Sequence, residues 1–380
     1  MTVPRGPVPF ARLPLTYAEC RARFLLAASE AGVPVAHHPL AVPGPDGELL
    51  SIDVAELGPS DAEALLVVLS GVHGVEGFAP SALQCDLLDR VGADDLPAGV
   101  GVLLVHAVNP WGMAWWRREN ESNVDLNRNW RRSDVEPQAN DAYDEVHDLA
   151  CPATPTLPDV DDLLGRVAEL AAARGGAWVR DAVTVGQYRH PDGLHYGGAH
   201  TEASNRVLEQ VAGDRIVGRR GALIVDLHTG HGPRGVLTLL SDEPPGSDQD
   251  RFLRAHFPDA IVEATTGNPA ATTGAKYGQI ANGIRALLPA GSCWSTSAEI
   301  GTVNDLEQLA ATYRSRWVAF HGDRTVPEHA AAVSAYRCCF TPDDHGWERE
   351  AIVRGRSLLD SAIQATQTIA ADADRRPTGA

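Results

Sequence analysis

Short apolar runs bounded by glycine-rich turns recur along the chain and alternate with stretches whose apolar residues fall at helical spacing. None of the runs approaches the roughly 20 apolar residues that a membrane span needs. Strands that alternate with helices predict an α/β fold in which a mixed, mostly parallel sheet is flanked by helices. The predicted strands are residues 49–54, 65–69, 101–108, 222–227, 237–240, 260–263, 284–288 and 297–303. The predicted helices are residues 17–32, 79–91, 138–150, 160–174, 304–320 and 347–370.

Domain organisation follows from the absence of any repeat or convincing linker in the sequence. We expect one domain over residues 1–380, with a helical and loop insertion at about 131–215. The insertion contains the polar, aromatic and glycine-rich segment 186–201, which has the composition of a binding loop. Its histidines, His190, His195 and His200, are interpreted as solvated, and His106 as a core histidine because it lies within an apolar run.

Composition excludes several classes of partner. A formal charge of −18 argues against nucleic acid, whose phosphates require basic patches. The first residues contain no continuous apolar segment of the kind that a secretory signal has. The six cysteines form no CxxC pair, so we expect a reduced, cytoplasmic protein. The sequence leaves the oligomeric state open.

Candidate chemistry begins where the apolar run 65–69 ends in a glycine-rich turn that carries His73 and Glu76. Ligands of open α/β sheets bind at the carboxyl ends of the strands, where this turn should lie. Imidazole nitrogen and carboxylate oxygen are both ligands for Zn²⁺. The three-residue spacing is weak evidence by itself, because it also occurs in pairs that only share a surface hydrogen bond.

Two later segments supply the groups that such a site lacks. His228 follows the apolar run 222–227, and Glu299 is the one acid on the predicted strand 297–303. Two histidines and a glutamate around Zn²⁺, with a free carboxylate to move protons, form a complete set for metal-assisted hydrolysis. An acid on an apolar strand is costly to bury, so an ion pair with an arginine is the alternative role for Glu299.

The ordered motifs HGVEG, NPWG, NVDLNRNW, DLHTG and AEIGT resemble those of the M14 zinc carboxypeptidases. They are most similar to the DUF2817 branch of that superfamily, which is related to succinylglutamate desuccinylase and aspartoacylase. The resemblance spans about residues 50 to 320 and implies a zinc carboxypeptidase-like fold. It implies that His73, Glu76 and His228 bind one Zn²⁺ and that Glu299 is the general base and then the general acid.

The resemblance also implies which residues contact the substrate. Arg118 matches the arginine that polarises the scissile carbonyl and stabilises the oxyanion, and the adjacent Arg117 is the alternative for that position. Asn127 and Arg128 match the pair that holds the substrate's terminal carboxylate, which a guanidinium can grip bidentately.

Two aspartates are candidates for orienting the histidines. Asp125 matches the acid that orients the first zinc histidine, because a ligating imidazole usually gives its other N–H to a carboxylate. Asp226 lies two residues before His228 on the same strand face and is a weaker candidate for the same role. One departure concerns the substrate-binding tyrosine of the family, because its expected position falls near Arg285, which could select an acidic group or lie on the surface.

These observations predict a zinc-dependent hydrolase that cleaves a C–N amide bond of a carboxylate-bearing peptide or N-acyl amino acid. A metallocarboxypeptidase-like peptidase is the first choice, and an N-acyl amino acid deacylase of the aspartoacylase type is the second. A catalytically silent binding protein is a third alternative, although all four candidate residues are intact. A serine hydrolase is disfavoured because no GxSxG motif stands at a strand end.

Overall fold

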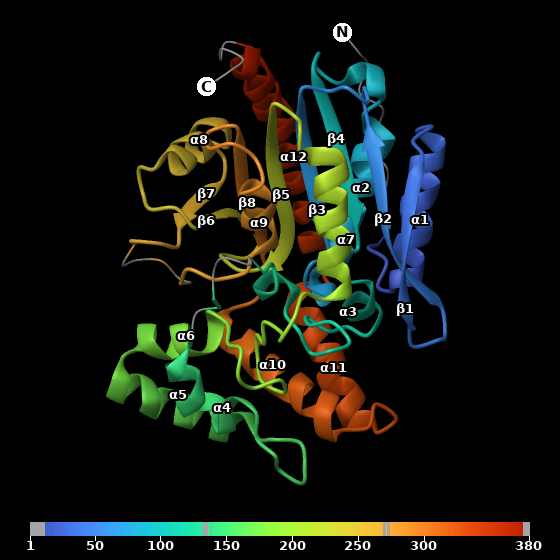
Figure 1. Ribbon diagram of the computed structural model, residues 1–380. Coiled ribbons are helices and arrows are strands. Elements are labelled where there is room, and N and C mark those ends of the chain that lie inside the picture. The colour runs from blue at the N-terminus through green and yellow to red at the C-terminus, as the bar shows by residue number, and fades with distance from the viewer. Residues whose placement is uncertain (1–11, 132–135, 138, 269–270, 272–273, 375–380) are drawn as a thin grey trace.

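The computed structural model describes residues 12–131, 136–137, 139–268, 271 and 274–374. Within these residues one eight-stranded sheet has the order β1-β2-β4-β3-β5-β8-β6-β7 (Figure 1). The strands are β1 Val35–Pro43, β2 Leu49–Leu57, β3 Ala64–Ser70, β4 Val100–His106, β5 Gly221–Gly230, β6 Leu237–Ser241, β7 Ile261–Ala264 and β8 Cys293–Gly301. The central strands β4, β3, β5 and β8 are mutually parallel, so their carboxyl ends share one edge. The predicted mixed, mostly parallel sheet is confirmed.

Helices cover both faces of the sheet (Figure 1). On β5, Leu223 and Val225 face a core that includes α2 (Phe78–Arg90) and α12 (His345–Asp374), whereas Ala222 and Ile224 face a core that includes α7 (Ala203–Val211) and α9 (Ile280–Arg285). This division follows from the two-residue period of a strand. The helices are α1 Tyr17–Glu30, α2 Phe78–Arg90, α3 Pro110–Ala114, α4 Asp141–Ala150, α5 Val160–Arg174, α6 Gly176–Thr184, α7 Ala203–Val211, α8 Asp248–His256, α9 Ile280–Arg285, α10 Asp305–His321, α11 Pro327–Phe340 and α12 His345–Asp374. In the described parts of the chain, no helix is both long enough and apolar enough to cross a membrane.

One predicted strand is wrong, and the sequence pattern missed the strand β1 and several helices, the longest of them α11. The predicted strand 284–288 is wrong, because Ile280, Ala281 and Ile284 bury one face of the helix α9 at helical spacing. The sequence pattern missed β1, an edge strand that leaves much of its length exposed and contains Pro39. An edge strand tolerates proline because one row of its N–H groups needs no partner.

The insertion predicted at about 131–215 contains α4, α5, α6, the loop 186–201 and α7. Its residues 132–135 and 138 lie outside the described residues. The predicted helices 138–150 and 160–174 correspond to α4 and α5. Helices α4 to α6 lie beyond the carboxyl edge of the central strands, together with α10 and α11 (Figure 1). They pack around a small core of their own that contains Tyr143 and Ala182.

Candidate metal centre

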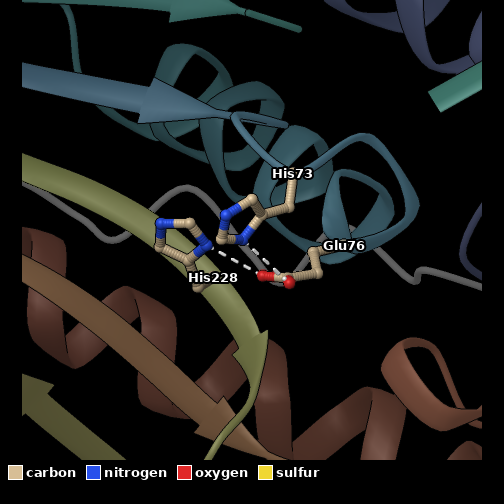
Figure 2. Close-up of side chains that lie close together, drawn as sticks. All are labelled: His73, Glu76 and His228. Carbon is tan, nitrogen blue, oxygen red and sulfur yellow. Dashed lines mark hydrogen bonds and ion pairs between the residues drawn. The ribbon is translucent and has the colours of Figure 1, made fainter. Parts of the chain in front are cut away.

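Three side chains from two separate segments meet at the carboxyl edge of the central strands (Figure 2). His73 and Glu76 come from the turn after β3, and His228 lies on the neighbouring strand β5. The Nδ1 atom of His73 lies 3.0 Å from Oε1 of Glu76, and Nδ1 of His228 lies 2.8 Å from Oε2. One ligand atom from each buried residue lies within 4.8 Å of the other two. The structure therefore brings the three predicted ligands to one point.

The turn after β3 directs His73 and Glu76 to the same side. Gly71 has a φ of 63°, a left-handed conformation that favours glycine, and the strand ends just before it. His73 caps the single 3-10 turn η1 (Gly74–Glu76). Residues three apart in such a turn eclipse each other, so the carboxylate lies beside the imidazole. A Cβ on Gly74 would lie 2.1 Å from the backbone of α3, so this close approach requires glycine.

A buried aspartate faces the second ring nitrogen of each histidine. His73 Nε2 lies 3.2 Å from Oδ1 of Asp125, and His228 Nε2 lies 2.8 Å from Oδ2 of Asp226. Both Nδ1 atoms are thereby turned toward Glu76. Among the described residues, the buried His73 Nδ1 has no contact partner other than Glu76 Oε1. Two imidazoles oriented by carboxylates, with one carboxylate between them, fit Zn²⁺.

The charges around the cluster also suit a cation. Burial alone would raise the pKa of Glu76, but His73 and His228 hold that pKa below its usual range. Burial acts in the same direction on Asp125, and Arg118 together with other cationic neighbours keeps its pKa well below the ordinary value. Both carboxyl groups are therefore anionic at neutral pH, which a metal ligand and its orienting group require.

Asp125 connects several predicted residues to the cluster. Its Oδ1 accepts a hydrogen bond from the backbone N–H of Asn127 at 2.9 Å, and its Oδ2 accepts one from Nε of Arg118 at 3.2 Å. Nη1 of Arg118 also donates to Oε1 of Glu76 at 3.1 Å. The adjacent Arg117 turns away and donates to Glu119. Of the two arginines that the sequence left open, Arg118 is the one that reaches the cluster.

The interpretation of His195 as a solvated loop residue is wrong. Its side chain is only 14% exposed, and its Nδ1 lies 3.1 Å from Oδ2 of Asp125. Burial lowers the pKa of His195 to about 4, so its ring is neutral at physiological pH. His200, by contrast, is 76% exposed, as predicted. No local pattern separates the two, because the contact depends on how the loop 186–201 folds back over the site.

The side chains of the predicted substrate residues Asn127 and Arg128 both form hydrogen bonds within the protein. Asn127 donates to Oδ2 of Asp226 at 3.3 Å and accepts from the backbone N–H of Ile280 at 2.9 Å. Arg128 is buried, and its guanidinium donates to backbone carbonyls, including that of Thr184 at the end of α6. Asn127 therefore joins β5 to the first turn of α9, and Arg128 holds the end of α6.

Glu299 lies on β8 in register with His228 on β5. Paired residues on adjacent strands point to the same face, so its carboxylate lies beside the cluster. The residue is half-buried, and Oε2 accepts a hydrogen bond from the backbone N–H of His231 at 3.3 Å. Across the described residues Glu299 forms no ion pair with an arginine, so the alternative structural role has no support.

Arg285 lies in the last turn of α9, away from the end of that helix that contacts the site. Its Nη2 lies 3.0 Å from Oε1 of Glu243. Because a helix rises 1.5 Å per residue, Arg285 lies about 8 Å along α9 from Ile280, whose N–H binds Asn127. The substrate contact of Arg285 stays a prediction, and its ion pair gives that prediction no support.

A second group of possible ligands, His147, His190 and Asp192, also has atoms within 4.8 Å of one another. The two imidazole rings are stacked, with centroids 4.0 Å apart and planes only 23° from parallel. Nitrogen lone pairs lie in the ring plane, so nearly parallel rings cannot both direct a nitrogen at one ion. Arg316 lies 3.2 Å from the Asp192 carboxylate and neutralises it. We therefore interpret this group as ring stacking and ion pairing.

Residues 14–354 match the family described as "Protein of unknown function (DUF2817)". The chain therefore belongs to the DUF2817 family, as its ordered motifs predicted. No curated protein matches the chain.

Several solved structures are similar in fold. Carboxypeptidase A from Helicoverpa armigera has 14% sequence identity and a TM-score of 0.48, with 86% of this chain and 75% of that chain covered. A protein from Shewanella amazonensis SB2B, provisionally described as a metallopeptidase, has 14% identity and a TM-score of 0.44, with coverage of 86% and 94%. A protein from Shewanella frigidimarina NCIMB 400, provisionally described as a succinylglutamate desuccinylase/aspartoacylase, has 14% identity and a TM-score of 0.37, with coverage of 76% and 70%.

Proposed function

We propose that this protein is a zinc-dependent hydrolase that cleaves the C–N amide bond of a carboxylate-bearing substrate. The observation that supports this most strongly is the convergence of His73, Glu76 and His228, with Glu299 beside them on the next strand. A Zn²⁺ ion bound by the three residues would act as a Lewis acid and lower the pKa of water to about 7.

The protein's own groups would then move the protons and stabilise the developing charge. Glu299 would take a proton from the attacking water and deliver it to the departing amine nitrogen. Arg118, which donates to Glu76 at 3.1 Å, can turn one of its N–H groups to the negative charge that develops on the carbonyl oxygen. Asp125 and Asp226, 3.2 Å and 2.8 Å from the Nε2 atoms of His73 and His228, would keep the two histidines in their tautomer and orientation.

A metallocarboxypeptidase-like peptidase is the first candidate within this class, because the NVDLNRNW and AEIGT motifs resemble those of carboxypeptidases. An N-acyl amino acid deacylase would need the same proton transfers at the same bond. A panel of N-blocked dipeptides and N-acetyl amino acids distinguishes the peptidase from the deacylase. The released amino acids are measured by mass spectrometry.

The decisive variant is Glu299→Gln. The wild-type protein should contain one zinc ion per chain and release an amino acid from the panel. Glu299→Gln should keep its zinc and lose about 10²- to 10⁴-fold in kcat, because general acid–base catalysis contributes that much. Glu328→Gln, at a carboxylate that is 69% exposed, is the matched control and should keep full activity. Unchanged turnover by Glu299→Gln would contradict the mechanism.

Metal content tests the ligand set separately from turnover. His73→Ala should contain no zinc by elemental analysis, whereas His200→Ala, at an exposed histidine, should contain as much as the wild type. His190→Ala should also retain its zinc, because the stacked histidine pair cannot direct both nitrogens at one ion. Zinc that remains bound to the His73→Ala protein would refute the proposed centre.

A further inference from the structure

One buried carboxylate, that of Asp125, connects several residues around the proposed centre. Its two oxygens can accept about four hydrogen bonds, and four donors lie within 3.2 Å of them. Oδ1 faces Nε2 of His73 at 3.2 Å and the backbone N–H of Asn127 at 2.9 Å. Oδ2 faces Nε of Arg118 at 3.2 Å and Nδ1 of His195 at 3.1 Å. One oxygen therefore faces a proposed metal ligand, and the other is shared by Arg118 and His195.

Arg118 and His195 contact the same oxygen, so the position of each depends on the other. The guanidinium of Arg118 also donates from Nη1 to Oε1 of Glu76 at 3.1 Å. Because a guanidinium is planar, these two contacts, with Asp125 and with Glu76, set the direction of its remaining N–H groups. If Oδ2 of Asp125 moved, the direction of the group proposed to stabilise the oxyanion would change with it.

The hydrogen bond from His195 fixes this oxygen without adding charge. An ionised carboxylate only accepts hydrogen bonds, so the ring must present a protonated Nδ1 to Asp125. Burial is the main cause that lowers the pKa of His195, to about 4, and repulsion from Arg118 and Arg128 acts in the same direction. The neutral ring therefore leaves the negative charge of Asp125 to pair with Arg118. A cation in place of His195 would compete with Arg118 for the same oxygen.

The backbone around His195 is bound to the segment that contains Asp125. The backbone N–H of Asp125 donates to the carbonyl of Tyr196, directly after His195, at 2.8 Å. The side-chain amide of Asn129 donates to the carbonyl of Gly197, also at 2.8 Å. His195 itself has a φ of 50°, a left-handed conformation that costs energy in any residue other than glycine. Such a conformation persists only where surrounding contacts determine it, and here they direct the imidazole at Asp125.

We infer that His195 is a positioning residue for the proposed reaction, because it holds Oδ2 of Asp125 and through that oxygen directs Arg118 at the developing oxyanion. The inference rests on the proposed amide hydrolysis, and it gives the loop 186–201 a part in that reaction. His195 should affect the chemical step, in which Arg118 stabilises the transition state. It should not affect the metal, because His73 contacts the other oxygen of Asp125.

Two substitutions at position 195 separate the hydrogen bond from the packing. His195→Phe keeps a ring but has no donor, and it should lower kcat about 10- to 100-fold, because a small misplacement of a catalytic group has an effect of that size. Its KM should change less than about threefold, because the lost interaction acts only in the transition state. Its zinc content should equal that of the wild type.

His195→Asn keeps an N–H at the position of Nδ1 and tolerates the left-handed backbone, so it should recover kcat to within about threefold of the wild type. His200→Phe, the same exchange at a histidine of the same loop that is 76% exposed, is the control and should keep full activity. Equal losses of kcat in His195→Phe and His195→Asn would overturn the assignment, and so would a loss of zinc from His195→Phe.

A double-mutant cycle tests whether the effect of His195 passes through Arg118. In an Arg118→Met background, His195→Phe should lower kcat by less than about twofold, because residues that act through one another are not additive. A loss in that background as large as the loss in the wild-type background would overturn the inference, since His195 would then act independently of Arg118.

Nuclear magnetic resonance gives a readout that needs no turnover. In protein with ¹⁵N-labelled histidine, comparison with His195→Asn identifies the imidazole signals of His195. At neutral pH these signals should be those of a neutral ring that is protonated at Nδ1, and a charged ring or one protonated at Nε2 would overturn the inference. The expected tautomer in a protein that hydrolyses nothing would refute the proposed function and leave the contact with Asp125 standing. Turnover with a different tautomer would refute the inference alone.

Discussion

Two buried aspartates contact the histidines of the proposed centre, and the two aspartates have different surroundings. The charge of Asp125 is balanced by Arg118 and by a contact with His195. Asp226 has only His228 and the Asn127 amide, and its Oδ1 has no hydrogen-bond partner among the described residues. A buried carboxylate with so few partners depends strongly on the proton or metal that its histidine carries.

Asp226→Asn is therefore a sensitive probe of the metal. Asparagine keeps an oxygen near His228 Nε2 but loses the negative charge that raises the basicity of the ring. We expect the affinity for zinc to fall about 10- to 100-fold, as measured by competition with a fluorescent chelator. Asp344→Asn, at an exposed carboxylate paired with Arg234, is the control and should bind zinc as tightly as the wild type. An unaltered affinity in Asp226→Asn would show that His228 does not need this partner.

At the scale of elements, the end of α6 and the loop 186–201, both in the segment predicted to be an insertion, contact the site. The carbonyls at the C-terminal end of α6 carry the negative end of the helix dipole, and Arg128 places a positive charge against them. The loop 186–201 contributes Tyr188, which binds the Arg128 carbonyl, and His195, which contacts Asp125. Helix and loop thus contact the same short segment of chain, from Asp125 to Arg128.

Removing the Arg128 side chain should loosen the insertion. Arg128→Ala removes the donor from one buried and two part-buried carbonyl groups, and we expect the free energy of unfolding to fall by about 2–4 kcal/mol in urea titrations. Arg174→Ala, at an exposed arginine paired with Glu145 on the same insertion, should change it by less than about 1 kcal/mol. Similar small changes in both variants would mean that Arg128 does not hold the insertion.

At the scale of the molecule, the sequence predicted those features that depend on residues close together in the chain. The apolar runs of β3 and β5 and the glycine-rich turn that carries His73 were visible in the sequence, because strand period and turn chemistry act over a few residues. The edge strand β1 was missed, since exposed strands lack an apolar run. The burial of His195 and the enclosure of Arg128 were also missed. Both depend on segments 70 and 56 residues away in the chain, whose packing no local pattern encodes.

The proposed centre joins the turn after β3 to the end of β5, so bound zinc should stabilise the whole molecule. A ligand present at 100 times its Kd stabilises the folded state by about 2.7 kcal/mol. For a chain of 380 residues this corresponds to a rise in the unfolding midpoint of about 3 °C. Protein stripped with EDTA should therefore gain about that much when zinc is returned, as measured by calorimetry. His73→Ala should gain nothing, and His200→Ala should gain as much as the wild type. A midpoint that rises equally in His73→Ala would place the stabilising metal elsewhere in the protein.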